Sequence, residues 1–181
     1  MDKHRAIVGL SLPVIALAAA CGAEEDVTPT GTATPPPTEP PASASLPETS
    51  GSAVWDYLEG VEYRTGWELW PGKGEKYEGT EPHGMLLTTY LNDAAFEALA
   101  NRAGSMPPGS IIVKENYMPD GTYDAATVMY KVAGYDPSNN NWFWTKITAD
   151  GAIEAEGRVA DCAACHSARS DNDYIYTGSL Q

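Results

Sequence analysis

The chain has 181 residues, 25 of them acidic and 11 basic, and its formal net charge at pH 7 is −14. Nucleic-acid binding depends on basic patches, so this charge argues against a nucleic-acid partner. An acidic surface attracts a basic redox partner, and it equally serves to keep a protein soluble.

Residues 1–20 predict the signal peptide of a bacterial lipoprotein. The basic start "DKHR" precedes the apolar run "AIVGLSLPVIALAAA", which is too short to span a membrane, and Cys21 follows directly. "LAAAC" is similar to a lipobox, whose cysteine becomes the lipid-carrying N-terminus. The alternative is an ordinary signal peptide cleaved nearby. We therefore expect export to the periplasm or cell envelope, with a lipid anchor to the membrane at Cys21.

Residues 21–52 predict a disordered tether that begins at the lipidated cysteine. Seven of the 14 prolines lie here among many Thr, Ser and Ala residues, and only Val27 and Leu46 are sizeable apolar residues. Such a segment cannot bury enough apolar surface to offset the entropy lost on ordering. We expect it to link the anchor to a folded domain.

Residues 53–181 are numerous enough for one compact domain. Runs of β-branched and aromatic residues predict strands at 84–92, 109–117, 125–135 and 141–148. "DPSNNN" (136–141) predicts a turn, and 92–104 predicts a helix capped by Asn92 or Asp93. The expected class is α+β, mainly an antiparallel β-sheet with a few helices.

The C-terminal stretch "VADCAACHSARSDNDY" contains the pattern C-x-x-C-H at Cys162, Cys165 and His166. Two thiols at this spacing can add to the vinyl groups of one haem, and the adjacent histidine can bind the iron. Three alternatives fit less well. A redox-active thiol pair would need a preceding strand, and a zinc site would need further ligands. A plain disulfide would leave His166 without a role. The pattern therefore predicts one covalent haem c, with His166 as axial ligand.

The position of this motif excludes the common small electron carriers. Those cytochromes are helical, bind haem near the N-terminus and use a methionine ligand further along the chain. Here no methionine follows Met129. The earlier methionines of the domain are more typical of packing than of ligation, and they are Met85, Met106, Met118 and Met129.

Several short segments, in their order, resemble the cytochrome P-460 family, which includes the beta-sheet cytochromes c-prime. These segments, from about Tyr63 to Thr177, are "WPG", "PHG" followed by "YLN", "GSIIVKENY", "VMYKVAGYDP", "NWFW" and the late "CAACH". The resemblance implies a sheet-rich domain with haem c on one sheet face, often as a homodimer. It implies His166 as the proximal ligand and an iron whose other side is open.

The resemblance also implies what such a haem does. Some members oxidise hydroxylamine to nitric oxide or nitrous oxide, and others bind nitric oxide or carbon monoxide. The oxidising members join a lysine, which matches Lys114, to the porphyrin, and they use a distal carboxylate for which Glu115 and Asp136 are the candidates. We expect a cytochrome acting on hydroxylamine or a related small nitrogen species; the alternatives are a non-catalytic nitric oxide binder and an electron-transfer cytochrome.

Strand alternation bears on these lysine and carboxylate assignments. In "SIIVKENY", Lys114 shares a face with Ile112, and Glu115 points the opposite way, which weakens Glu115 as a distal acid if Lys114 faces the haem. Lys114 has three explanations: a solvent-exposed face, a haem propionate, or a covalent bond to the ring. Lys131 and Lys146 lie on other strands and are weaker candidates for that bond.

Two further features of the domain have alternative interpretations. His83 either supplies a sixth iron ligand, which closes the haem, or forms a hydrogen bond within its "PHG" turn; the family resemblance favours the turn. Trp142 and Trp144 alternate with Phe143 and are expected on one sheet face, in the core, at a dimer contact or against the haem.

Overall fold

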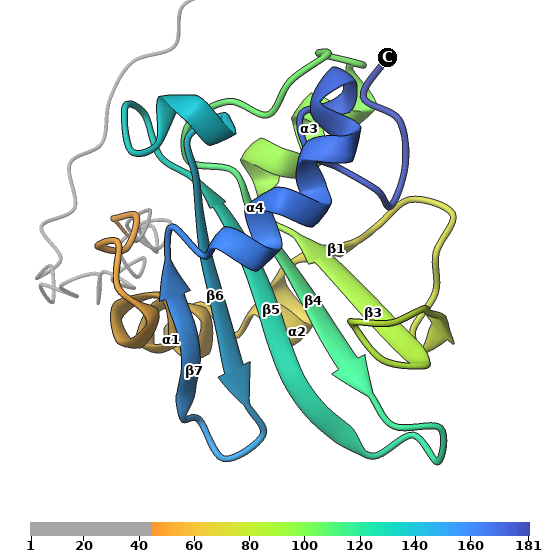
Figure 1. Ribbon diagram of the computed structural model, residues 1–181. Coiled ribbons are helices and arrows are strands. Elements are labelled where there is room, and N and C mark those ends of the chain that lie inside the picture. The colour runs from red at the N-terminus through yellow and green to blue at the C-terminus, as the bar shows by residue number, and fades with distance from the viewer. Residues whose placement is uncertain (1–44) are drawn as a thin grey trace, which may run out of the picture. The chain divides into compact units, whose positions relative to one another are not determined.

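The computed structural model describes residues 45–181 (Figure 1). The predicted signal peptide, Cys21 and most of the predicted tether lie outside the described residues. Helix α1 (Gly51–Gly60) begins two residues before the expected start of the domain, and the Ser50 side chain caps it by accepting from Ala53 N. Among residues 45–181, no helix is long and apolar enough to cross a membrane.

An antiparallel sheet of seven strands organises the described part of the chain. Four strands form its centre: β3 (Leu86–Leu91), β4 (Ile111–Tyr117), β5 (Tyr123–Lys131) and β6 (Trp142–Thr148). The order is β1-β3-β4-β5-β6-β7, with β2 also paired to β3. The shorter strands are β1 (Glu68–Leu69), β2 (Tyr77–Glu78) and β7 (Ile153–Gly157). The predicted α+β class with a mainly antiparallel sheet is confirmed.

The helices and the 3-10 turns fill the connections between these strands. Helix α3 (Asp93–Ala100) begins at the predicted cap, since the Asn92 side chain accepts from Ala95 N at 3.1 Å, but it ends earlier than predicted. The expected 136–141 turn contains the 3-10 helix η1 (Pro137–Asn139). The remaining elements are α2 (Tyr63–Gly66), α4 (Ala160–His166) and η2 (Ser167–Asn172).

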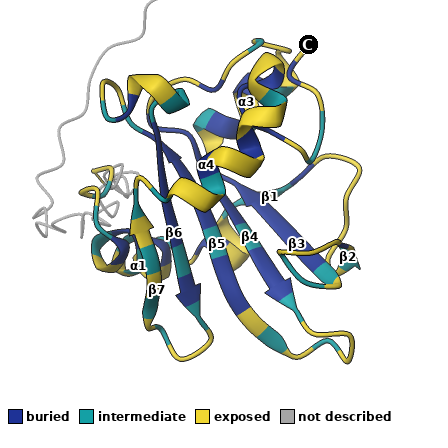
Figure 2. Ribbon diagram, viewed as in Figure 1, coloured by how far each residue is buried: buried dark blue, intermediate teal, exposed yellow. Residues whose placement is uncertain are grey.

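Each face of the sheet has its own apolar core. Side chains of α1 and α2, including Val54 and Leu58, pack with Val113 and Phe143 on one face. On the other face, α3 and the C-terminal segment pack with Trp142 and other strand residues. Figure 1 shows α4 crossing the near face while α1 and α2 lie behind the sheet, and Figure 2 shows the central strands buried along most of their length. The sheet therefore separates two environments.

Candidate cofactor site

A cavity of about 240 Å³ lies on the sheet face covered by α4. Strands β4, β5, β6 and β7 contribute to it, together with α4, the residues just before β3 and the C-terminal segment. Much of its lining is apolar, including Trp70, Ile112, Met129 and Ile175. The lining residues with reactive or ligating groups are His83, Lys114, Lys146, Asp161, Cys162, Cys165 and His166.

Helix α4 brings the three residues of the C-x-x-C-H motif to this cavity. Cys162 and Cys165 are three residues apart on the helix and therefore lie on neighbouring positions of one face. Both thiols are free; Cys162 is half-buried and Cys165 is exposed. His166 ends the helix and is buried. The thiols and the imidazole predicted to act together thus line one cavity.

A backbone hydrogen bond fixes the orientation of the His166 ring. Its Nδ1 lies 2.7 Å from the carbonyl oxygen of Tyr174, which can only accept, so Nδ1 carries the proton and Nε2 keeps a free lone pair. The ring packs against Trp144, with centroids 4.8 Å apart, and against Tyr176 at 5.4 Å. Burial lowers the pKa of His166, and Lys114 lowers it further, while the Tyr174 bond opposes them. The neutral ring is the form that binds metals.

A buried ion pair holds the segment that provides this carbonyl. Asp173 accepts from Lys131 Nζ at 2.6 Å and from Met106 N at 2.7 Å, and its own carbonyl accepts from Trp142 Nε1 at 3.1 Å. Both side chains are almost fully buried. Sequence reasoning missed this pair, because its members are 42 residues apart; the one hint was a lysine at the end of an apolar strand.

Lys114 lies in the cavity, as strand alternation predicts if this face meets the cofactor. Its side chain has no hydrogen bond or ion pair within residues 45–181. Burial lowers its pKa to about 8, so a large share of the amine is neutral near pH 8. A neutral amine is a nucleophile, whereas the amine of an ordinary surface lysine is almost entirely protonated at that pH.

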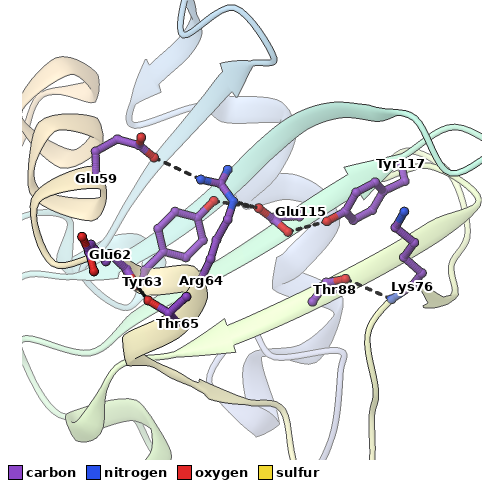
Figure 3. A network of polar contacts seen from close by, with 9 residues as sticks. All are labelled: Glu59, Glu62, Tyr63, Arg64, Thr65, Lys76, Thr88, Glu115 and Tyr117. Carbon is purple, nitrogen blue, oxygen red and sulfur yellow. Dashed lines mark hydrogen bonds and ion pairs between the residues drawn. The ribbon is translucent and has the colours of Figure 1, made fainter.

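Glu115, the residue next to Lys114, lies on the opposite face of the sheet. Its carboxylate is 1% exposed and accepts from Tyr63 Oη at 2.8 Å, Arg64 Nε at 2.6 Å and Tyr117 Oη at 2.5 Å. Figure 3 shows Tyr63 and Arg64 reaching this carboxylate from α2. The sheet thus lies between Glu115 and the cavity.

Asp136, the other carboxylate considered as a distal acid, also lies away from the cavity. It precedes η1, is buried, and accepts from Asn139 Nδ2 at 2.9 Å. Among the residues that line the cavity, the carboxylate is the exposed Asp161, in the first turn of α4. Its position directly before Cys162 is the signal by which sequence reasoning could have found it.

His83 lines the same cavity from the connection between β2 and β3. Its Nδ1 lies 3.2 Å from Thr127 Oγ1, so the predicted hydrogen bond reaches a strand rather than the turn itself. Its ring centre is 6.1 Å from that of His166. Burial, Lys114 and His166 lower the pKa of His83 to about 3, so this ring is also neutral.

The tryptophans and methionines complete the surroundings. The prediction that Trp142 and Trp144 share a face is confirmed, since both belong to the core cluster on the cavity side. Trp144 also lines the cavity, and its Nε1 is buried without a hydrogen-bond partner in the described part of the chain. Among the methionines considered as ligands, Met129 lines the cavity, Met106 is in the core, and Met85 and Met118 are exposed.

The residues present fit a haem. Two free thiols and a histidine with an available Nε2 lie beside an apolar cavity, and such walls suit a porphyrin ring. The side-chain donors of Lys114 and Trp144, which have no partner in the part of the chain that the structure describes, are suited to acceptor atoms such as carboxylates on a bound group. Within residues 45–181, no cluster of three or more His, Cys, Asp or Glu side chains is placed to hold a metal ion.

These features define a sheet-based protein with a site for a prosthetic group that needs an axial histidine. The profile of the cytochrome P460 family matches residues 64–177, more than half of the chain. The chain belongs to this family, so it is a cytochrome with a haem cofactor. No curated protein matches the sequence significantly.

Proposed function

We propose that the chain is an exported c-type cytochrome, lipid-anchored at Cys21 in the bacterial periplasm or cell envelope, that acts on small nitrogen species. The reaction we favour is the oxidation of hydroxylamine to nitrogen oxides. The observation that carries this proposal is the convergence on one cavity of Cys162, Cys165, His166 and a Lys114 whose pKa is lowered to about 8 by burial.

The residues of α4 hold the cofactor in this proposal. Cys162 and Cys165 would hold a single haem through two thioether bonds, each formed by addition of one S–H across one vinyl group. His166 offers Nε2 as the axial ligand, since Tyr174 fixes its other nitrogen. A haem held there would supply the redox chemistry for oxidising the substrate, with an outside redox partner as the final electron acceptor.

Lys114 is the residue that we propose to tune the cofactor. A bond from its Nζ to a porphyrin ring carbon replaces one N–H and one C–H bond, so an oxidant such as a peroxide must accept the two hydrogens. Its lowered pKa supports the role, because only the neutral amine has a free electron pair. Glu115 and Asp136 lie away from the cavity, and Asp161, the carboxylate in its lining, belongs to the same helix as His166.

Non-catalytic binding of nitric oxide is the second function, and the apolar lining of the small cavity favours it. A diatomic gas needs an iron and space but no proton acceptor. Electron transfer is the third, and it requires both axial positions of the iron to be filled. A homodimer, as in many members of the family, is compatible with each of the three.

Peptide mapping and a substrate titration test the proposal together. A protease digest should yield haem on the peptide that contains Cys162 and Cys165. The same haem should join this peptide to the peptide that contains Lys114. Hydroxylamine should reduce the ferric haem of the wild type and not that of Lys114→Met. The proposal of an enzyme would be abandoned if haem is found on the α4 peptide alone and hydroxylamine does not reduce it. Binding of nitric oxide by such a protein would support the second function, gas binding.

A further inference from the structure

The chain reverses direction after η2, and this reversal returns the C-terminal segment to the end of α4. Asp173 and Tyr174 have positive φ angles of 51° and 71°, a conformation that residues other than glycine adopt at a cost in free energy. Two contacts hold the reversal: Tyr174 N donates to Arg169 O at 2.8 Å, and Asp173 forms its buried ion pair with Lys131. The sequence therefore maintains this return of the chain against its local conformational preference.

Tyr176 is a residue of the returning segment that contacts both the backbone and the side chain of the axial histidine. Its hydroxyl donates to the carbonyl oxygen of Cys165 at 3.0 Å. That carbonyl belongs to the peptide bond between Cys165 and His166, so the contact holds the backbone directly before the histidine. The ring of Tyr176 also meets the His166 ring edge-on, with centroids 5.4 Å apart and planes inclined by 86°.

The exposure of Tyr176 argues against a role in core packing alone. The residue is 44% exposed, although it lines the cavity, whereas the histidine that it contacts is 7% exposed. Its ring also lies under the guanidinium of Arg169, at 5.6 Å from the centroid. A ring left this open to solvent buries only part of its apolar surface. Its ordered contacts with the end of α4 therefore indicate a function in holding His166.

We propose that Tyr176 is a positioning residue for His166, and that its hydroxyl strengthens the bond between the imidazole and a bound iron. This inference rests on the haem attachment of the proposed function. Tyr174 fixes the rotation of the ring through Nδ1, and Tyr176 fixes the peptide to which that residue is joined. Residues that hydrogen-bond around a metal ligand orient it and tune how strongly it donates to the metal. Tyr176 itself makes no bond to the iron.

Removal of the hydroxyl should weaken His166 as a donor. Tyr176→Phe keeps the ring and its contact with the histidine, and it removes the hydrogen bond to Cys165. A less firmly held imidazole donates less electron density, which disfavours the ferric state, so the reduction potential should rise. Tyr176→Leu also removes the ring contact and should raise the potential further.

Resonance Raman spectra of the ferrous holoprotein and a potentiometric titration test the inference. The iron–histidine stretching band should be narrow in the wild type, lower in frequency and broader in Tyr176→Phe, and lower still in Tyr176→Leu. The reduction potential should rise in the same order.

Tyr135→Phe is the matched control. Arg158 lies over the Tyr135 ring at 5.3 Å from the centroid, much as Arg169 lies over that of Tyr176. Tyr135 packs against the core on the other face of the sheet and does not line the cavity. Its variant should therefore change neither the band nor the potential.

Three outcomes would overturn the inference. The first is an unchanged band and potential in Tyr176→Phe, which suffices by itself even if Tyr176→Leu does not fold. The second is an equal change in Tyr135→Phe, which would attribute the effect to a general loosening of the fold. The third is a wild type whose covalent haem shows no iron–histidine band. The proposed function fails separately: if Tyr176→Phe shifts the band but hydroxylamine does not reduce the wild type, Tyr176 keeps its role and the oxidation of hydroxylamine is abandoned.

Discussion

Adjacent residues of strand β4 lie in different environments on the two faces of the sheet. Lys114 lines the cavity and has no partner among residues 45–181, whereas the adjacent Glu115 is buried on the other face among Tyr63, Arg64 and Tyr117. Successive strand residues point to opposite faces, so neighbours in sequence do not share an environment. Adjacent charges can therefore differ in role, and each can be changed alone.

Glu115→Gln should destabilise the fold and leave the haem unaffected. The change removes a charged acceptor from three donors, and a hydrogen bond to a charged group contributes about 1.5–3 kcal/mol. Urea unfolding should show a loss of that order, with an unchanged optical spectrum. Glu59→Gln is the control, since its contact with Arg64 at 3.1 Å is exposed and should contribute little. Loss of hydroxylamine reduction at full stability would instead make Glu115 part of the reaction.

The reactivity of Lys114 should depend on pH in an unusual range. With a pKa of about 8, its amine is half neutral at pH 8, whereas an ordinary lysine with a pKa near 10.4 is less than about 1% neutral there. In haem-free protein, acetylation of Lys114 should rise through pH 8 and level off above pH 9, as followed by mass spectrometry of digests. A rate that keeps rising through pH 10 would mean that burial does not lower this pKa.

At the scale of elements, the C-terminal segment after α4 determines how the axial histidine is presented. Helix α4 places His166 at the cavity, but the orientation of its ring comes from Tyr174, eight residues later. That carbonyl is positioned by the pairing of Asp173 with Lys131 of β5. A change on the sheet can therefore reach the iron through the segment.

Lys131→Met should test this connection. Removal of one partner of a buried pair leaves an uncompensated charge and costs about 3–5 kcal/mol. The stability loss should appear in urea unfolding, and the reduction potential should rise because a looser Tyr174 carbonyl makes His166 a weaker donor. The double variant Lys131→Met/Asp173→Asn should recover part of both effects. An unchanged potential in an unstable Lys131→Met protein would restrict the pair to a role in folding.

At the scale of the whole molecule, an acidic domain follows a segment that predicts a lipid anchor. Cys21→Ser should move the protein from the membrane fraction to the soluble fraction, because a serine hydroxyl cannot receive the lipid through a thioether. Cell fractionation with haem staining measures this, and haem content should stay the same. A wild type found only in the soluble periplasm would refute the anchor.

Local patterns were sufficient to predict the central strands and the cap of α3. The two-residue strands β1 and β2 are too short to show alternation, and α1 follows directly on the proline-rich segment. The partners of Glu115 in α2 were not predictable, because tertiary packing brings together residues about 50 positions apart. For the same reason, the approach of His83 to His166 had no signal in the sequence.

The position of the cavity walls in the chain has a consequence for assembly. Every strand that lines the cavity precedes α4, which carries both thiols. If the protein is exported from its N-terminus, the anchor reaches the membrane first, the sheet can pair next, and the haem attachment motif arrives after it, followed by the segment of Tyr174 that orients His166. The attachment machinery would then work at the membrane surface on a nearly finished protein, and insertion of the haem would be the closing step of maturation.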